Sequence, residues 1–369
     1  MSVISAPARA TAPRRSPHRG PRWAAVRFTA LLAVLAAALV MATLLAVSLG
    51  AVRVPLSDTW RIIAHHVLPG SVTPSFTAIQ DRIVWDFRMP RALLAIFVGA
   101  GLALVGAVLQ AVVRNPLADP FLLGVSSGAS LGAVLVLVLG AQAVGGLGMS
   151  AAAFLGSLVA LGVVYLLAQR AGRITAARLL LSGVAVAYLF QALFSFVLQR
   201  AQTGQVAQQV LFWLLGSLAG ARWDVLPVPA VMLAVALVVL LVQWRPLNAL
   251  LAGEETATSL GINVTRFRGG LFVLTSLLIG CLVAVSGAIA FVGLIIPHIA
   301  RLLVGSDHRR VLPVTALAGA AFLQLVDIAA RTLDQPQELP LSIVTAIFGV
   351  PFFLWLLRRR STDAPVGAA

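Results

Sequence analysis

Apolar residues fall in ten long runs along the chain, separated by short segments rich in Arg, Pro, Gly and Asp. Each run approaches the roughly 20 residues that an α-helix needs to cross a hydrocarbon core of about 30 Å. Isolated Gly and Pro residues are tolerated in membrane helices. The pattern therefore predicts an all-α, polytopic membrane protein with about ten transmembrane helices. The runs are 28–49, 92–113, 121–140, 149–168, 179–198, 225–243, 269–286, 288–304, 311–330 and 339–357.

The stretch from 269 to 304 is almost continuously apolar and too long for one crossing. We divide it at Ser286-Gly287, because that dipeptide suits a tight turn. Three connecting segments are long enough to carry function. Segments 51–91 and 199–224 lie on one side of the membrane, and the second contains the amphipathic stretch VAQQVLFWLLGSLAG. Segment 245–268 is the longest connection on the other side.

The composition excludes an ordinary soluble domain. The 369 residues are 60% hydrophobic and 11% charged, whereas soluble domains carry about 25% charged residues. We assign residues 27–360 to the membrane domain. The Arg- and Pro-rich residues 1–26 are expected to be a disordered cytoplasmic tail, and 361–369 a short C-terminal one. The first apolar run exceeds the length of a signal-peptide core, so we interpret it as a retained helix.

All 27 basic residues are arginine, and the net charge is +15. If the N-terminus is inside, ten crossings put 19 of these arginines on the inner side and both termini in the cytoplasm. This is the bias that the positive-inside rule requires. The distribution predicts a multi-pass protein of the cytoplasmic membrane, and we expect the membrane to be that of a bacterium. It also explains the basic charge without a nucleic-acid partner.

The chain offers little to catalysis. A phosphate-binding P-loop needs a lysine, and the sequence has none. We therefore expect no cofactor on this chain; if transport is ATP-driven, ATP and Mg²⁺ are used by a partner subunit. The five histidines, His65-His66 included, do not cluster with carboxylates at metal-ligand spacing, so no metal site is predicted. Cys281 is the single cysteine and is interpreted as a packing residue. The lack of a catalytic cluster disfavours a membrane enzyme.

One segment, RMPRALLAIFVGAGLALVGAVLQAVVRNPLADPFLLGVSSGASLG, is the most informative. Arg88 and Arg91 stand where an outer segment enters a predicted helix. Gly124, Gly128 and Gly132 recur every four residues and favour close helix–helix packing.

The RMPR…RNPLADPFLLGVSSGA run resembles the signature of the FecCD family, permeases for iron–siderophore, haem and cobalamin uptake. Further similar motifs follow in family order over roughly residues 30–360. They are GEETATSLGINVTRFRG, GAIAFVGLIIPHIARLLVGSDHRRVLP, ALAGAAFLQLVDIAAR and ELPLSIVTAIFGVPFFLWLLRR. The resemblance implies the permease of a type II ATP-binding-cassette importer. A ferric siderophore is the first expected cargo, with haem or cobalamin as the alternative.

A secondary transporter is the less favoured reading, because such proteins place ionisable groups near the bilayer midplane. Asp327 is the one candidate, and it is expected near the outer end. The family resemblance implies other partners: a second permease copy (a homodimer) or a close paralogue, two ATPase subunits, and an extracytoplasmic substrate-binding protein.

The resemblance also implies coupling helices at about 248–264 that contact the ATPase. Their expected residues are Gly253, Glu254, Glu255, Ala257, Leu260 and Gly261. Acidic residues in the first turn stabilise a helix, and Ala257 and Leu260 are expected to share an apolar face.

At the outer side, the resemblance implies that Arg88, Arg91 and Arg331 receive acidic residues of the binding protein through bidentate pairs. The alternative is that Arg331 pairs with Asp327, four residues earlier on the same helix. The family places its translocation path along the fifth and tenth helices. The corresponding residues are Ser182, Gly183, Tyr188, Gln191, Ser195, Thr345 and Gly349.

Overall fold

The computed structural model describes residues 21–362 except for 51, 74 and 202–203. Most of the two predicted tails, 1–26 and 361–369, lies outside these residues. The first helix already begins at Pro21. The helices are α1 (Pro21–Ser48), α2 (Leu56–Val67), α3 (Ala78–Arg82), α4 (Met89–Val113), α5 (Val125–Leu139), α6 (Met149–Ala168), α7 (Ala176–Leu198), α8 (Gly204–Leu214), α9 (Pro227–Val242), α10 (Trp244–Ala252), α11 (Glu254–Ser259), α12 (Val264–Ser286), α13 (Val292–Val304), α14 (His308–Thr332) and α15 (Leu341–Thr362).

Apolar helices account for all ten predicted runs. Within the described residues, seven helical stretches are long and apolar enough to cross a membrane. Three shorter apolar helices, at Val125–Leu139, Val292–Val304 and Leu341–Trp355, supply the rest. The all-α polytopic fold is confirmed. The boundary between α12 and α13 is confirmed as well, because α12 ends at Ser286 and Gly287 follows it.

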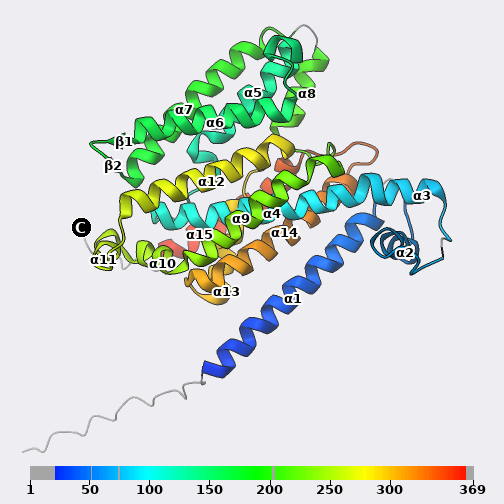
Figure 1. The fold of residues 1–369 in the computed structure, drawn as a ribbon, viewed down its shortest axis with the longest axis horizontal. Helices are drawn as coiled ribbons and strands as arrows, with labels where there is room; N and C mark the ends of the chain where they lie inside the picture. Colours follow the sequence, from blue (N-terminus) through cyan, green and yellow to red (C-terminus); the bar gives the residue numbers. More distant parts are fainter. Residues whose placement is uncertain (1–20, 51, 74, 202–203, 363–369) are drawn as a thin grey trace, which may run out of the picture.

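Helix α4 forms the centre of one group of helices, and it packs against α12, α13 and α14. Close approach depends on glycine pairs at the crossings. A Cβ on Gly106 would overlap the backbone of Gly293 in α13, and one on Gly99 would overlap Gly319 in α14. These contacts explain why this part of the bundle buries most of α4. Helix α1 lies along α14 at the edge of the group (Figure 1).

Helices α5, α6 and α7 form a second group, and α12 runs between the two groups (Figure 1). The predicted glycine stripe is the contact surface of this second group. Gly128 faces Gly156 of α6, Gly132 faces Ala152, and Gly124 approaches the carbonyl of Gly183 in α7. The stripe therefore serves helix packing, as its four-residue spacing predicts.

The connecting segments gather at two opposite ends of the bundle (Figure 1). Helices α2, α3 and α8 mark one end, which we call the α8 end. Helices α10 and α11 and a small hairpin mark the other, the α11 end. The hairpin pairs β1 (Gln169–Arg170) antiparallel to β2 (Arg173–Ile174), with Gln169 opposite Ile174. Segments predicted to share a side of the membrane thus share an end of the molecule.

The predicted outer loop 51–91 is largely helical, which differs from the expectation. Helix α3, the π-helical segment Ile83–Arg88 and α4 form one helical stretch of 36 residues, Ala78–Val113. Thr77 caps its start through a reciprocal pair of hydrogen bonds with Gln80. Pro90 cannot donate to the carbonyl one turn back, and the wider π-turn stands directly before it. Arg88 and Arg91 therefore lie within a helix and not at its entrance.

Candidate functional site

The three arginines predicted for docking lie together at the α8 end. Arg88, Arg91 and Arg331 line a cavity of about 390 Å³, with Glu338 among the other lining residues. We call these three arginines, together with Asp327 and Glu338, the arginine cluster. The cluster joins α4, α14 and the segment that leads into α15.

Arg88 is 8% exposed and is held by backbone oxygens. Its Nη1 donates to the carbonyls of Val47 and Ser48 at 2.9 and 2.8 Å, and its Nη2 donates to Val52. Within the described residues it forms no salt bridge. The guanidinium therefore ties the end of α1 to the helical stretch before α4, and its charge is balanced by carbonyl dipoles.

Arg91 binds two carboxylates at once. Its Nε donates to Asp327 Oδ1 at 2.9 Å. Its two terminal nitrogens donate to Glu338 Oε1 and Oε2, each at 2.9 Å. The second contact is the parallel, two-bond arrangement that makes arginine–carboxylate pairs strong and directional.

Arg331 shares Asp327 with Arg91. Its Nε lies 3.0 Å from Asp327 Oδ2, the pairing of residues four apart predicted as the alternative to docking. Its other nitrogens donate to the carbonyls of Ala46 and Leu49 at 2.9 and 3.2 Å. All three arginines are thus engaged inside the protomer, and their contact with a partner stays a prediction. The cluster holds three positive and two negative groups.

At the α11 end, two short helices meet at a sharp corner. Gly253 joins α10 to α11 with a φ of 141°, and Gly261 follows α11 with a φ of 79°. Residues with a side chain rarely adopt such angles. The two glycines thus set the direction in which the six-residue α11 leaves α10 and returns to α12. The range 248–264, predicted for coupling, contains α11 and the second half of α10, which begins at Trp244; the coupling role stays a prediction.

Glu254, the first residue of α11, is bonded within the protomer. Arg268 Nη2 donates to Glu254 Oε1 at 2.6 Å, and Arg268 Nη1 donates to the Ile174 carbonyl at 2.9 Å. Arg268 is 1% exposed. It links α11, α12 and β2, so Glu254 has a structural role here. Glu255 beside it is exposed.

Ala257 and Leu260 do not share one apolar face, so this part of the prediction is wrong. Ala257 is fully buried, whereas Leu260 is 68% exposed. Helix α11 ends at Ser259, and Leu260 takes the position after it, where the chain turns. The buried Ala257 seats the helix on the bundle, and Leu260 remains as an apolar side chain at the tip.

A polar junction ties α10 to the start of α14. Asn248 Nδ2 donates to Asp307 Oδ1 at 2.8 Å, and Asn248 Oδ1 accepts from the His308 amide at 2.9 Å. Burial raises the pKa of Asp307, but hydrogen bonds from Asn248 and the Arg309 amide, with nearby positive charge, bring it below its ordinary value. The carboxylate therefore stays ionised and caps α14. This junction connects the corner at Gly253 to a long helix that ends in the arginine cluster.

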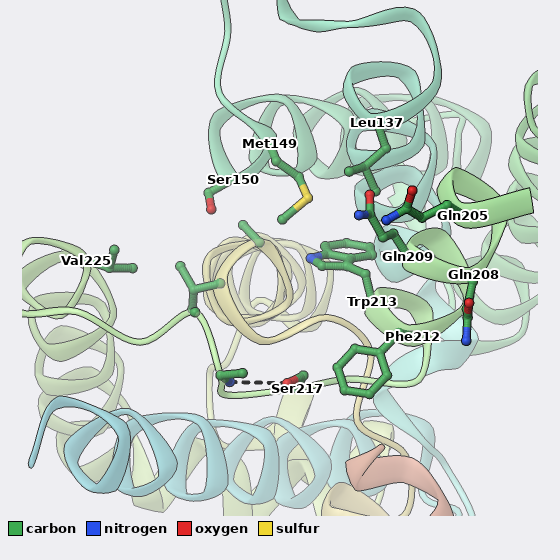
Figure 2. A pocket seen from close by; sticks show the side chains of 14 residues that line it. Leu137, Met149, Ser150, Gln205, Gln208, Gln209, Phe212, Trp213, Ser217 and Val225 are labelled. Carbon is green, nitrogen blue, oxygen red and sulfur yellow. Dashed lines mark hydrogen bonds between the residues drawn. The ribbon is translucent and has the colours of Figure 1, made fainter. Parts of the chain in front are cut away.

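A second cavity, of about 580 Å³, lies beside α8. Figure 2 shows Gln205, Gln209 and Trp213 gathered on one side of it, with Met149 and Ser150 approaching from α6. Every residue that lines the cavity is uncharged. Such a surface offers amide and hydroxyl groups beside apolar side chains, and no counter-ion for a charged ligand.

Comparison with known proteins assigns the chain to a family. The model of the FecCD transport family matches residues 38–359. The chain belongs to the FecCD transport family. It is therefore an ABC importer permease, and the identification made from the motifs is confirmed.

Three relatives illustrate the match. The cobalamin import permease BtuC of Halobacterium salinarum is 46% identical over 76% of this chain and 75% of its own length. The hemin transport permease HmuU of Yersinia pestis is 42% identical over 75% of this chain and 84% of its own. A solved inward-facing ABC transporter of the metal-chelate type is 34% identical. It covers 90% of this chain and 99% of its own, with a TM-score of 0.77.

The residues predicted for the FecCD translocation path fall into two groups. Tyr188, Gln191 and Ser195 are exposed on α7, and Tyr188 is 73% exposed. Ser182, on the same helix, is half-buried. The exposed side chains are free to line a path beside α7.

Three other path predictions do not fit a lining role in this structure. Gly183 packs against Gly124, and Gly349 packs against the ring of Phe291. Thr345 is fully buried and donates to a carbonyl in its own helix. These three residues were predicted to line the path because they are small and weakly polar, but in this structure the same properties allow close helix packing.

Metal-binding side chains do not gather in the part of the chain that the structure describes. His66 Nε2 lies 2.9 Å from Asp81 Oδ1, and its ring stacks on Trp85 at 4.2 Å. His65 makes an edge contact with Phe76. Cys281 is buried. The two histidines therefore hold α2 against the stretch from Phe76 to Trp85 within the outer segment.

Sequence reasoning missed two residues of these sites, Glu338 and Arg268. Glu338 stands directly before the last apolar run, and Arg268 directly before the seventh. A charged residue at the edge of a membrane span was the available signal. Its partner could not be inferred, because Arg91 and Glu338 are separated by 247 positions.

Proposed function

We propose that this chain is the transmembrane subunit of a cobalamin importer. The likeness to permeases that are named for cobalamin carries the proposal. A ferric siderophore was the first expectation from the motifs. The relatives described above are named for cobalamin and haem instead, so we put cobalamin in its place.

The cavity beside α8 supports the same cargo. Its glutamine amides and serine hydroxyls are donors and acceptors for neutral polar groups, and Trp213 and Phe212 add apolar surface. Cobalamin carries many carboxamide groups around its ring. Haem carries two carboxylates, for which this cavity has no cationic partner. Haem remains the second candidate because HmuU is similar over most of its length.

In this proposal two copies of the permease form a homodimer in the cytoplasmic membrane, with both termini in the cytoplasm. Two ATPase subunits dock at the α11 end, where Leu260 presents an exposed apolar side chain. The exposed residues of α7 line the path between the copies. ATP hydrolysis belongs to the ATPase subunits, because this chain has no lysine for a P-loop.

A substrate-binding protein docks at the α8 end. The arginine cluster carries one more positive than negative group and borders a cavity, which suits an acidic side chain of the partner. The internal bonds of the three arginines hold their guanidinium groups in place before the partner arrives.

Uptake into proteoliposomes tests the function. The permease is reconstituted with its ATPase subunit, ATP is enclosed, and the purified binding protein is added outside with radiolabelled cyanocobalamin. We expect uptake that requires ATP and the binding protein. Ferrichrome and haemin serve as competing cargoes. Preferential uptake of either would overturn the cobalamin assignment, and uptake without the ATPase would overturn the importer mechanism.

A further inference from the structure

The two carboxylates of the arginine cluster sit in very different surroundings. The Asp327 side chain is 1% exposed and lies between Arg91 and Arg331. The Glu338 side chain is 35% exposed, and among the described residues its salt bridge is to Arg91 alone. Among the described residues, the hydrogen bonds of Glu338 to the cluster are therefore those to the two terminal nitrogens of Arg91.

This difference decides which carboxylate an incoming acid can replace. Removing Asp327 from its place would leave the buried Arg331 without its salt-bridge partner and Arg91 with Glu338 alone, which is strongly unfavourable. Losing Glu338 costs less, because Arg91 keeps its salt bridge to Asp327 and water solvates the partly exposed Glu338 when it leaves. Both groups border the cavity of the cluster. A carboxylate entering there can take over the two N–H donors of Arg91 without leaving any charge unpaired.

Glu338 also lies next to a hydrogen-bonded junction between two elements. The Leu341 amide, the first of α15, donates to the Gly216 carbonyl just after α8. The Ser342 amide donates to the Leu215 carbonyl, and both distances are 3.0 Å. The salt bridge to Arg91 anchors the chain three residues before this junction. Without that anchor, the backbone hydrogen bond from the Leu339 amide to the Ala330 carbonyl, at 2.9 Å, still ties this stretch to α14.

We propose that Glu338 is a displaceable internal counter-ion of Arg91, which a carboxylate of the docking partner replaces, and that its release loosens the junction of α8 with α15. The displacement rests on the docking function proposed above. The loosening follows from the chain's own contacts and can be tested on the permease alone. Through Glu338, binding of an acidic partner and loosening at the α8 end therefore occur together.

Hydrogen–deuterium exchange on the purified, full-length permease tests the anchor. The variant Glu338→Gln keeps the side-chain size but can accept only one of the two N–H groups. We expect the amides of Leu341 and Ser342 to exchange several-fold faster in it than in the wild type. The matched control is Asp334→Asn, which removes one charge from the same loop, where Asp334 forms no salt bridge within the described residues. Equal exchange in both variants would overturn the proposal.

The affinity for the substrate-binding protein of this importer tests the displacement. We expect Glu338→Gln to bind the protein roughly fivefold more tightly than Asp334→Asn does. In Glu338→Gln the partner's carboxylate no longer competes with the Glu338 carboxylate for Arg91, and the gain corresponds to one exposed ion pair. Glu338→Asp, which keeps the charge but shortens its reach, should fall between. A thermal melt of each variant in detergent verifies that it is folded.

The outcomes separate the two proposals. If the binding protein does not slow exchange over residues 78–91 and 331–340 of the wild type, docking at the cluster is wrong. If it does, and the Gln and Asn variants have the same affinity, docking stands and Glu338 is not displaced. Weaker binding by Glu338→Gln would also overturn the displacement.

Discussion

At the scale of single residues, burial decides which half of an ion pair matters more for stability. The Arg268 side chain is 2% exposed and its partner Glu254 is 44% exposed. Without Arg268, the Glu254 carboxylate is solvated by water. Without Glu254, a buried guanidinium keeps only the Ile174 carbonyl. Breaking a buried pair costs most when the charge that remains cannot reach water.

We therefore predict that Glu254→Ala destabilises the protein by about 3 kcal/mol, more than Arg268→Met does. The double variant should be more stable than Glu254→Ala alone, because the stranded charge is gone. Thermal unfolding of the purified protein measures all three. Glu255→Ala, at the exposed neighbouring position, is the control and should change stability by less than about 0.5 kcal/mol. If the stability lost in the double variant equals the sum of the losses in the two single variants, this explanation is wrong.

Asp119 illustrates a second residue-scale effect, in the turn between α4 and α5. Its carboxylate accepts from the Phe121 amide at 2.8 Å. Burial raises the pKa of Asp119 above its ordinary value of 3.8, although this hydrogen bond lowers it. A raised pKa in the folded state means that stability is lost as the pH rises through it, since the folded protein prefers the neutral acid.

Because the pKa of Asp119 is raised in the folded state, we predict that Asp119→Asn unfolds at a higher temperature than the wild type at neutral pH. The amide oxygen still accepts from Phe121, and no buried charge remains. The advantage should shrink as the pH falls through the raised pKa and vanish below 3.8, where the wild-type carboxyl is protonated in both the folded and the unfolded state. Melting curves across this range measure it. Asp119→Ala, which loses the acceptor, should be less stable than both by about 1 kcal/mol.

Residue-level contacts were predictable only where the partners are close in sequence. The pair of Arg331 with Asp327 follows from a spacing of four on a helix. Arg91 with Glu338 joins segments 247 positions apart, and no local pattern contains that information. The exposure of Leu260 was missed for a related reason, because it depends on where α11 stops.

At the scale of elements, backbone geometry at single positions sets how helices meet. The corner between α10 and α11 depends on Gly253, whose φ of 141° is almost closed to other residues. We predict that Gly253→Ala costs about 1–3 kcal/mol in stability. It should also lower cargo-stimulated ATP hydrolysis by the assembled importer, because α11 would leave α10 in another direction.

The control for this variant is Gly270→Ala. Gly270 lies inside α12 with open space around it, and alanine is the better residue in a helix by about 1 kcal/mol. That variant should melt at or above the wild-type temperature with normal ATP hydrolysis. Both are measured by thermal unfolding and by phosphate release in proteoliposomes. Normal hydrolysis by a folded Gly253→Ala importer would show that this corner does not carry the coupling.

Hydrophobic periodicity located the elements well but not their ends. All ten apolar runs became helices, since each needs its backbone groups satisfied within the segment. The extension of the second span back to Ala78 was not visible, because residues 78–91 are polar enough to resemble a loop. Tertiary contacts of Val84 and Arg88, both buried, stabilise that extension.

At the scale of the whole molecule, the two ends carry surfaces of different chemistry. The α8 end presents charged groups around a cavity, whereas the tip of α11 presents Leu260, 68% exposed. An apolar side chain at the tip of a short helix suits insertion into a cleft, where burial contributes about 2 kcal/mol. Membrane lipid cannot account for its exposure if the positive-inside assignment holds, because this end then lies in the cytoplasm.

We predict that Leu260→Asp reduces co-purification of the ATPase at least about tenfold, since it loses this burial and adds a charge to be desolvated. Leu68→Asp is the matched control, because Leu68 is 61% exposed at the opposite end. It should retain the ATPase fully. Both variants should keep the wild-type melting temperature, as neither side chain is packed. Loss of the ATPase from Leu68→Asp, or its retention by Leu260→Asp, would reverse the assignment of the two ends.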